Sequence, residues 1–572
     1  MGKELMKLGK FSVVFALWAV LGAAMFAAKA TGQAPEPKAR VVFFLSTDCP
    51  MAQRYAPRYV KLFAKYSKLN IDFKAYFPSR EYSRQMVAKY MRDNGFEFPF
   101  ELDLGAVKAK SENVVGVPTI VIYDANDKKV FQGKLDDNTD PTLIKRRYVE
   151  QVLDKLLAGQ AVAFSQTDFF GCVLMPADPP VSSDKVTYAE HIAPILNKHC
   201  MECHRRGEVA PFTLEGYENA RRWSPMLSVV AQERRMPPWK AVHGFGEFKH
   251  ENSLTETEIA TIANWDRAGA PKGDLSKAPP TPEFPKAWAL GEPDAILTPS
   301  QPFVVEPDGS DIYRNFVFKT NYAETRWVRA MAIRPGNPKI AHHVLTFVDN
   351  GNRAAQLEAE TKDGNLGYPS FGGPRFTPDG TIGGWVPGSL PYELPEGTAF
   401  ELKPGASIVV QVHYHKTGRQ ETDLTQIGLY FAKKPVRRPA QVAWLDNPKL
   451  QIPPNVDDHK VVTTHVMPEA VTIFSALPRM LLLGKSIRAE AELPDGSKIP
   501  LVWVDRWDFN WQITYTFAEP VQLPANTKIR VETVYNNSAS NMNNPNDPPK
   551  TVGWGESKTD ELAQLVLVYA KG

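Results

Sequence analysis

Three kinds of hydrophobic pattern follow one another along the chain. Up to about residue 160, short apolar runs alternate with stretches of helical periodicity. From 186 to 273 the apolar positions recur at helical spacing, and from 302 to 569 they mostly alternate with polar ones between Gly and Pro turns. The pattern predicts a multidomain fold: an α/β region, an all-α region and then tandem antiparallel β-sandwiches.

The α/β region is predicted from apolar runs that have the length of buried strands. These runs lie at residues 41–45, 71–77 and 120–123, and helical periodicity fills residues 50–66 and 81–94. The resulting alternation of strand and helix is typical of an α/β fold.

Three helices are predicted in the helical region. They cover residues 188–196, 219–235 and 254–268. The last begins with Thr255, followed three residues later by Glu258, which is the arrangement of a capping box. A proline-rich stretch at 279–282 then predicts a semi-rigid linker.

The β-rich region spans about 270 residues, which is enough for two sandwiches in tandem. The length of 572 residues predicts three or four domains. Their predicted bounds are an N-terminal signal or anchor at 1–30, an α/β domain at 31–180, a helical domain at 181–275, a Pro-rich linker at 276–300, and β-sandwiches at 301–440 and 441–572.

The composition is that of an ordinary globular protein, with 43% hydrophobic and 23% charged residues. The 48 prolines favour β-rich domains with long irregular loops over helix bundles. The formal net charge of +3 is small for this length, so the sequence predicts no nucleic-acid partner.

The first thirty residues have the pattern of an export signal. Lys3, Lys7 and Lys10 precede an apolar run at 11–28, and residues 28–30 form a small-x-small cleavage site. The run is also long enough to span a bilayer, so cleavage and retention as a membrane anchor both stay open. In either case the rest of the chain is expected outside the cytoplasm, in the periplasm or a comparable compartment.

The strongest chemical signal is the motif Cys-x-x-Cys-His, formed by Cys200, Cys203 and His204. Two thiols at this spacing attach one haem through thioethers, and the adjacent imidazole binds its iron. The sequence therefore predicts a c-type haem. Zinc binding by the two cysteines, or a disulfide between them, is the alternative.

Met236, in the sequence Met-Pro-Pro-Trp, is predicted as the second axial ligand because a thioether suits electron transfer. His243, His250 or a vacant position are the alternatives. Residues 188–196, the haem motif and residues 236–239 resemble the cytochrome domains fused to bacterial copper monooxygenase-like proteins. This resemblance implies a cytochrome c-like domain over most of residues 186–275.

Cys49 lies at the turn between the first predicted strand and helix. Together with Pro118, which precedes the third strand, it resembles the thioredoxin-like fold over residues 38–160, with Pro118 as the cis-proline. The family's second active-site cysteine is replaced by Ala52, so local dithiol exchange is not expected. Cys49 is thus a candidate one-cysteine peroxide or mixed-disulfide centre; the alternatives are a docking domain with a residual cysteine, or a bond to Cys172.

Six of the 11 histidines lie in the β-rich region: His342, His343, His413, His415, His459 and His465. Neutral imidazoles suit copper or zinc. On a regular strand His413 and His415 project to one face, whereas His342 and His343 project to opposite faces. A metal shared by both members of the latter pair therefore requires a local bend.

Residues 335–344 and 411–414 resemble the first-domain copper motifs of the copper type II, ascorbate-dependent monooxygenases. Peptidylglycine hydroxylating monooxygenase and dopamine β-hydroxylase are members of this family. The resemblance implies that His342, His343 and His413 bind the electron-transferring copper.

The positions of that family's second, oxygen-activating copper have lost their donors. Arg479 and Leu481 occupy its two histidine positions, and Leu562 occupies its methionine position. A guanidinium group cannot be deprotonated to bind metal, and leucine has no donor atom. The resemblance therefore implies one copper and a degenerate second site.

These features predict an exported redox protein, an electron-transfer or scaffold subunit that works with redox partner proteins or a membrane-bound complex. Two alternatives stay open. One is an active copper-dependent monooxygenase that receives electrons from the fused haem. The other is a thiol peroxidase or thiol-disulfide protein centred on Cys49, so the sequence leaves open whether the chain is an enzyme.

Overall fold

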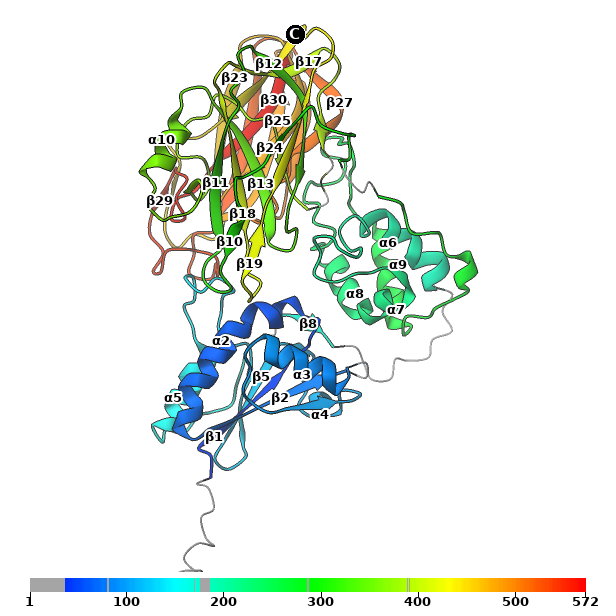
Figure 1. Cartoon of the computed structure of the whole chain (residues 1–572), viewed down its shortest axis with the longest axis vertical. Coiled ribbons are helices and arrows are strands. Elements are labelled where there is room, and N and C mark those ends of the chain that lie inside the picture. The colour runs from blue at the N-terminus through cyan, green and yellow to red at the C-terminus, as the bar shows by residue number, and fades with distance from the viewer. Residues whose placement is uncertain are drawn as a thin grey trace, which may run out of the picture.

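The computed structural model describes residues 36–79, 82–168, 170–174, 186–284, 288–387, 389 and 391–572. The predicted signal or anchor at 1–30 lies outside these residues. Within the described ranges, no helix is both long and apolar enough to cross a bilayer. Figure 1 shows an α/β part in blue, a helical part in green, and a β-rich part that carries the C-terminus.

The α/β part contains one mixed sheet. Its strands, in spatial order, are β3 (Phe100–Asp103), β2 (Ile71–Pro78), β1 (Ala39–Phe44), β5 (Thr119–Asp124), β6 (Lys129–Gly133) and β7 (Ser165–Gln166). Strands β1, β2 and β3 are parallel, whereas β5 runs antiparallel to both β1 and β6. The helices are α2 (Pro50–Tyr66), α3 (Arg84–Asp93), α4 (Val107–Ser111) and α5 (Tyr148–Leu157).

This order, a βαβ unit followed by a hairpin and a helix, makes the region thioredoxin-like, as predicted. Helix α2 matches the predicted range because Pro50 suits the first turn, where a backbone N–H has no helical partner. Helix α3 begins where the Ser83 side chain accepts a hydrogen bond from the backbone N–H of Met86. The bond between Val117 and Pro118 is cis.

The regular elements that begin between residues 186 and 275 are all helical. They are a π-helical turn (Tyr188–Ile192), α6 (Ala193–His199), α7 (Gly216–Arg222), α8 (Ser224–Gln232), α9 (Glu256–Arg267) and a 3-10 turn that starts at Leu275 (Leu275–Lys277). The capping box of Thr255 and Glu258 is present. The prediction of one helix over 219–235 is wrong: it breaks at Trp223, because Pro225 cannot donate a helical hydrogen bond and starts a new helix.

The β-rich part is built from three large sheets. The first contains β14 (Tyr368–Pro369), β11 (Ile312–Lys319), β18 (Ser407–Tyr414), β13 (Ala341–Asp349) and β15 (Gly384–Trp385). The second contains β27 (Tyr515–Leu523), β24 (Val471–Arg479), β30 (Gln564–Lys571), β21 (Arg438–Leu445), β17 (Thr398–Leu402), β12 (Arg326–Arg334), β20 (Gln426–Phe431) and β9 (Ala295–Leu297), with β16 (Tyr392–Glu393) beside β12. The third contains β23 (His459–Met467), β28 (Thr527–Tyr535), β25 (Gly484–Glu492) and β26 (Lys498–Val504).

Smaller elements complete this part. They are the strand pairs β10 (Phe303–Val305) with β19 (Glu421–Asp423) and β22 (Gln451–Ile452) with β29 (Val552–Gly553), and helix α10 (Arg353–Glu360).

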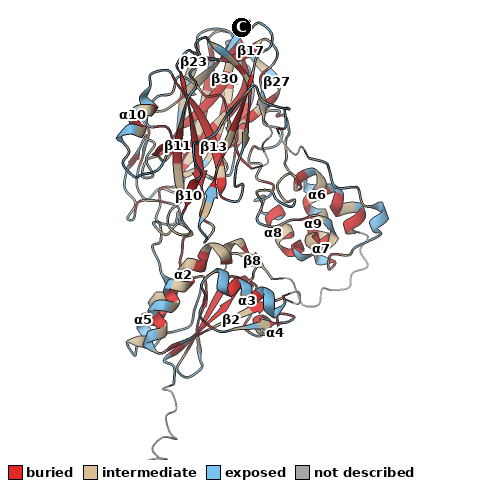
Figure 2. Cartoon of the chain, in the orientation of Figure 1, coloured by how far each residue is buried: buried red, intermediate tan, exposed pale blue. Residues whose placement is uncertain are grey.

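Two hydrophobic cores lie on the long second sheet. One is enclosed with the sheet of β11, β13 and β18, and the other with the sheet of β25, β26 and β28. Figure 2 shows β13 as mainly buried. The β-rich part is thus a pair of sandwiches that share one continuous sheet, joined where β17 runs parallel to β21.

Segments from the other two parts dock on the sandwiches. After α8, the backbone N–H of Val242 donates to the carbonyl of Trp503 at 2.8 Å, and Lys249 donates to Thr516 at 2.8 Å. From helix α2, Arg54 forms an ion pair with Asp311 at 3.0 Å. The helical part thus docks on the sandwich that contains β26 and β27, whereas the α/β part contacts the sandwich of β11, β13 and β18.

Candidate haem and metal centres

Three histidines meet where β13 pairs with β18. His343 and His413 are direct partners in the antiparallel register, and a β-bulge interrupts that register between Ala341 and His343. The bulge supplies the local bend that a shared site requires, and it brings His342 to the same side. The potential ligand atoms of His342, His343 and His413 all lie within 4.8 Å of one another.

The carboxylate of Asp311 orients one member of this cluster, His413. Nδ1 of His413 lies 3.2 Å from Nδ1 of His343, while Nε2 of His413 lies 3.1 Å from Oδ2 of Asp311. Burial acts to raise the pKa of Asp311, but the hydrogen bond with His413 and the nearby positive charge of Arg54 hold it below its usual range. Tyr313 stacks on His413 with ring centroids 4.2 Å apart. Sequence reasoning missed Asp311, because nothing near residue 311 marks it as a partner of residue 413.

The donor set fits a bound transition metal. Burial lowers the pKa values of His342 and His343 well below the usual value, so both rings are neutral and keep a lone pair. Nδ1 of His342 and Nδ1 of His415 are buried without a hydrogen-bond partner among the described residues. Buried polar atoms are rarely left unpaired, and a metal ion would satisfy such a nitrogen. Three imidazoles with a carboxylate behind one of them suit copper or zinc.

The haem motif follows helix α6. The backbone N–H groups of Cys203 and His204 both return to the carbonyl of Cys200, at 3.2 and 2.9 Å, which makes a compact turn. Burial raises the pKa of each cysteine thiol to about 12. No third histidine, cysteine or carboxylate of the described chain joins these two thiols in a metal-binding group.

His204 is held as an axial ligand would be. Its Nδ1 lies 3.1 Å from the carbonyl oxygen of Phe212, so Nδ1 carries the proton and Nε2 keeps its lone pair. Burial lowers the pKa of His204, which favours this neutral form. The ring of Phe212 in turn stacks on Trp223 at 3.8 Å between centroids.

One cavity joins the haem motif to the histidine cluster. It has a volume of about 760 Å³, within the range of about 300–1,000 Å³ that is usual for cofactor sites. Its lining includes Cys200, Cys203 and His204 together with His342, His415 and Trp511. The haem motif and one of the three predicted copper ligands, His342, which lies 138 residues after His204, therefore line the same cavity.

Met236 lines this cavity and is 39% exposed. His250 also lines it, whereas His243 does not, and the imidazole of His243 is bonded to Glu251 at 2.8 Å. Met236 and His250 thus share the cavity with the haem motif, whereas His243 is not part of its lining.

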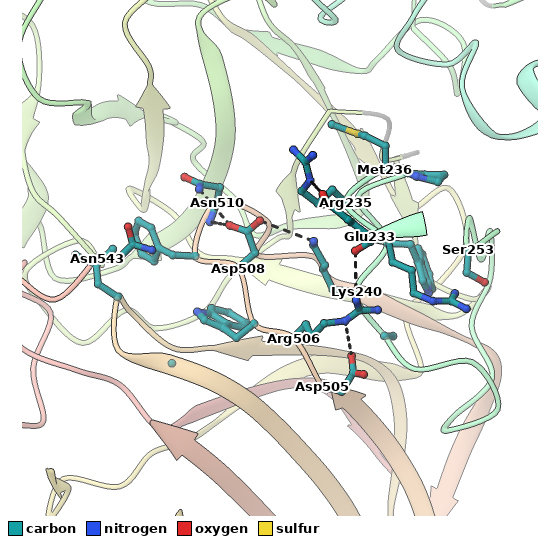
Figure 3. Close-up of a pocket in the computed structure, with 18 of the residues that line it drawn as sticks. Glu233, Arg235, Met236, Lys240, Ser253, Asp505, Arg506, Asp508, Asn510 and Asn543 are labelled. Atoms are coloured by element: carbon teal, nitrogen blue, oxygen red, sulfur yellow. Dashed lines mark hydrogen bonds and ion pairs between the residues drawn. The ribbon is translucent and has the colours of Figure 1, made fainter. Parts of the chain in front are cut away.

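Met236 also lines a larger cavity, of about 1,400 Å³, whose charged wall sequence reasoning missed (Figure 3). There Asp508 lies 3.8 Å from Nζ of Lys240, and Arg506 donates to the carbonyl of Glu233 at 3.2 Å. These residues come from segments almost 270 residues apart, so no local pattern marks them.

The positions at which the monooxygenase resemblance places a second copper hold buried residues. Arg479 donates to Oε1 of Gln564 at 2.6 Å and to the carbonyl of Gly372. Leu481 and Leu562 are fully buried. No group of metal-suited donors is present at these positions in the described residues.

A buried carboxylate, Glu561, holds the backbone at two of these positions, Leu481 and Leu562. It accepts hydrogen bonds from the backbone N–H groups of Leu481, Leu483 and Leu562. Burial raises its pKa to about 7 in spite of these donors. The segment around residue 481 is therefore held by hydrogen bonds from its backbone N–H groups to Glu561.

Cys49 lies at the N-terminus of α2, next to the cis-proline. Its Sγ donates to the carbonyl of Val117 at 3.4 Å. Cys172 lies on β8 (Cys172–Val173), which pairs with β4 (Gly116–Val117) so that Cys172 is opposite Val117. Both cysteines are buried free thiols.

Comparison with known proteins extends only to part of the chain. No protein-family model and no curated protein matches it. Solved structures similar to it include a hypothetical protein of Sinorhizobium meliloti 1021 (21% identity, TM-score 0.22, covering 24% of this chain and 79% of that one) and an uncharacterised conserved protein of Geobacillus kaustophilus (26%, 0.23, 24% and 76%). A secreted disulfide oxidoreductase of Mycobacterium tuberculosis, described as homologous to E. coli DsbE, is similar at 17% identity (TM-score 0.17, 21% and 81%).

Proposed function

We propose that this chain is an exported redox protein that holds a covalent haem at Cys200 and Cys203 and one copper at His342, His343 and His413. In this proposal, electrons pass between the two centres. The observation that carries it is the shared cavity, because the haem motif and His342 line the same space. The export-type N-terminus supports an extracytoplasmic location.

The residues around the haem motif suit a redox-active haem. When bound, such a haem supplies one-electron chemistry at an iron whose potential is set by its axial ligands. His204 is oriented by the carbonyl of Phe212, and the apolar side chains of Trp223, Met226 and Leu227 exclude water from the cavity wall.

The histidine cluster suits an electron-transferring copper. Asp311 fixes the tautomer and orientation of His413, as carboxylates behind metal-binding imidazoles do. Asp311 also forms an ion pair with Arg54 of helix α2, so the α/β part contacts the same site. The thioredoxin-like part would therefore help to position a copper ligand.

Electron transfer is better supported than oxygenation. The positions that would hold an oxygen-activating metal are occupied by Arg479, Leu481 and Leu562, none of which is a donor. The two terminal nitrogens of Arg479 donate to Gln564 and Gly372, while its Nε has no hydrogen-bond partner among the described residues. A coupled monooxygenase would need a second set of ligands, and the described residues hold no such group.

The proposal is tested by the kinetics of the copper-loaded holoprotein. After rapid anaerobic reduction with less than one electron per chain, we expect the haem absorption and the Cu(II) electron paramagnetic resonance signal to relax together. The relaxation rate should not depend on protein concentration, because the transfer is intramolecular. His343→Ala should abolish this phase, and a wild-type phase that scales with concentration would refute the proposal.

Met236 is expected to set the haem potential. Met236→Ala should lower the midpoint potential on the order of 100 mV, a fraction of the ~0.8 V that axial ligands span. Spectroelectrochemical titration measures this shift. His250→Ala is the matched control, because His250 lines the same cavity; a shift in the control and none in Met236→Ala would assign the position to His250.

A further inference from the structure

The two cysteines outside the haem motif are brought together at the cis-proline of the α/β part. Cys49 follows strand β1. Cys172 lies on β8, which forms a short antiparallel ladder with β4, and in this ladder Cys172 is paired with Val117. The carbonyl of Val117 accepts the hydrogen bond from Cys49 at 3.4 Å. Both cysteines are therefore neighbours of Val117: Cys49 through its hydrogen bond to the carbonyl, and Cys172 through strand pairing.

The sequence at β8 is adapted to this close approach. A Cβ atom on Gly171 would lie 2.1 Å from the carbonyl oxygen of Val117 and 2.7 Å from Cδ of Pro118. Only glycine lets the chain approach the cis-proline segment so closely. Cys49 is 1% exposed and Cys172 is 6% exposed, so the pair is shielded from bulk solvent.

The two thiols differ in acidity. Burial acts to raise the pKa of Cys49, but hydrogen bonds from Cys172 and from the backbone N–H groups of Ala52 and Met51 outweigh it and lower that pKa. The hydrogen bond with Cys49, and burial after it, raise the pKa of Cys172. One sulfur is thus favoured as a thiolate and the other as its proton-bearing partner, as in dithiol enzymes.

We propose that Cys49 and Cys172 form a redox-active dithiol that reduces peptide disulfides, with Cys172 acting in place of the second cysteine that Ala52 replaces. The Cys49 thiolate attacks one sulfur of the substrate disulfide, the S–S bond breaks, and the other substrate sulfur leaves as a thiolate. Cys172 then loses its proton and attacks Sγ of Cys49, which releases the second substrate sulfur. Counted from the Cys49 thiolate and the Cys172 thiol, the two cysteines lose two electrons and one proton; the substrate gains the two electrons, and it takes up that proton and one from solvent to become two thiols.

Substrate access requires β8 to move from β4. The ladder between them has two residue pairs, Gly116 with Val173 and Val117 with Cys172, so few hydrogen bonds oppose this opening. An extended peptide can then pair with the exposed edge of β4. The buried pair thus suits reaction with an extended disulfide-bearing segment.

The test uses the full-length holoprotein in buffers of reduced and oxidised glutathione, a peptide disulfide. After acid quenching and thiol labelling, mass mapping is expected to show one linked peptide pair, Cys49 with Cys172. Its fraction should follow a two-electron titration. Cys172→Ser should instead accumulate a glutathione adduct at Cys49, and Cys49→Ser should accumulate none at Cys172.

Two results would overturn the proposal. One is the absence of the linked pair in fully oxidised buffer. The other is a linked pair that resists reduced glutathione until the protein unfolds, since that is a fixed structural bridge. Gly171→Ala gives an independent check, because it displaces β8 and keeps both thiols: disulfide closure should slow at least about tenfold, and an unchanged rate counts against the site.

Discussion

Replacing Cys200 and Cys203 together by alanine is expected to remove covalent haem from the exported protein completely. Both thioethers are lost, and His204 alone cannot retain a porphyrin through denaturation. Haem staining of a denaturing gel should give a band for the wild type and none for the variant. The reduced-minus-oxidised absorption spectrum of the wild type should disappear as well.

The matched control for this experiment is the double variant Cys49→Ala/Cys172→Ala. It removes the same number of thiols and leaves the haem motif intact, so it should keep the haem stain at wild-type intensity. A stained Cys200/Cys203 variant would contradict the haem assignment. So would a colourless wild type whose Cys200 and Cys203 bind zinc or are bonded to each other.

Replacing His413 by alanine is expected to abolish copper binding. Nδ1 of His413 lies 3.2 Å from Nδ1 of His343, and Asp311 holds the imidazole ring of His413 in place. The variant therefore loses both a ligand and the hydrogen bond of that ligand to Asp311. After dialysis against a chelator, copper measured by mass spectrometry should fall from one ion per wild-type chain to the buffer background. Asp311→Asn should give a milder result, a roughly 10–100-fold weaker affinity.

His465→Ala is the control for the copper experiment. His465 lies on β23, in the sheet that encloses the second core, and should keep the wild-type copper content. Equal loss in the His413 and His465 variants would show that copper binds elsewhere. Two copper ions per wild-type chain would mean that a second site exists in spite of Arg479 and Leu481.

Local sequence was sufficient wherever a feature depends on neighbouring residues. The apolar runs predicted β1, helical periodicity predicted the bounds of helix α2, and the Thr255 capping box marked the start of α9. It was less reliable where a single residue overrides periodicity. Pro225 divides the predicted 219–235 helix, although the apolar spacing continues through it.

Period and spacing within single segments were enough to predict the order of the α/β, helical and β-rich parts and the haem motif. The resemblance to the copper monooxygenase motifs supplied His342, His343 and His413 as candidate ligands. Which of these groups meet depends on the tertiary structure. The bulge before His343, the Asp311 carboxylate behind His413, the cavity between His204 and His342, and the approach of Cys172 to Cys49 all join distant segments. Such contacts follow from strand pairing and core packing across the whole chain, which no local window of sequence records.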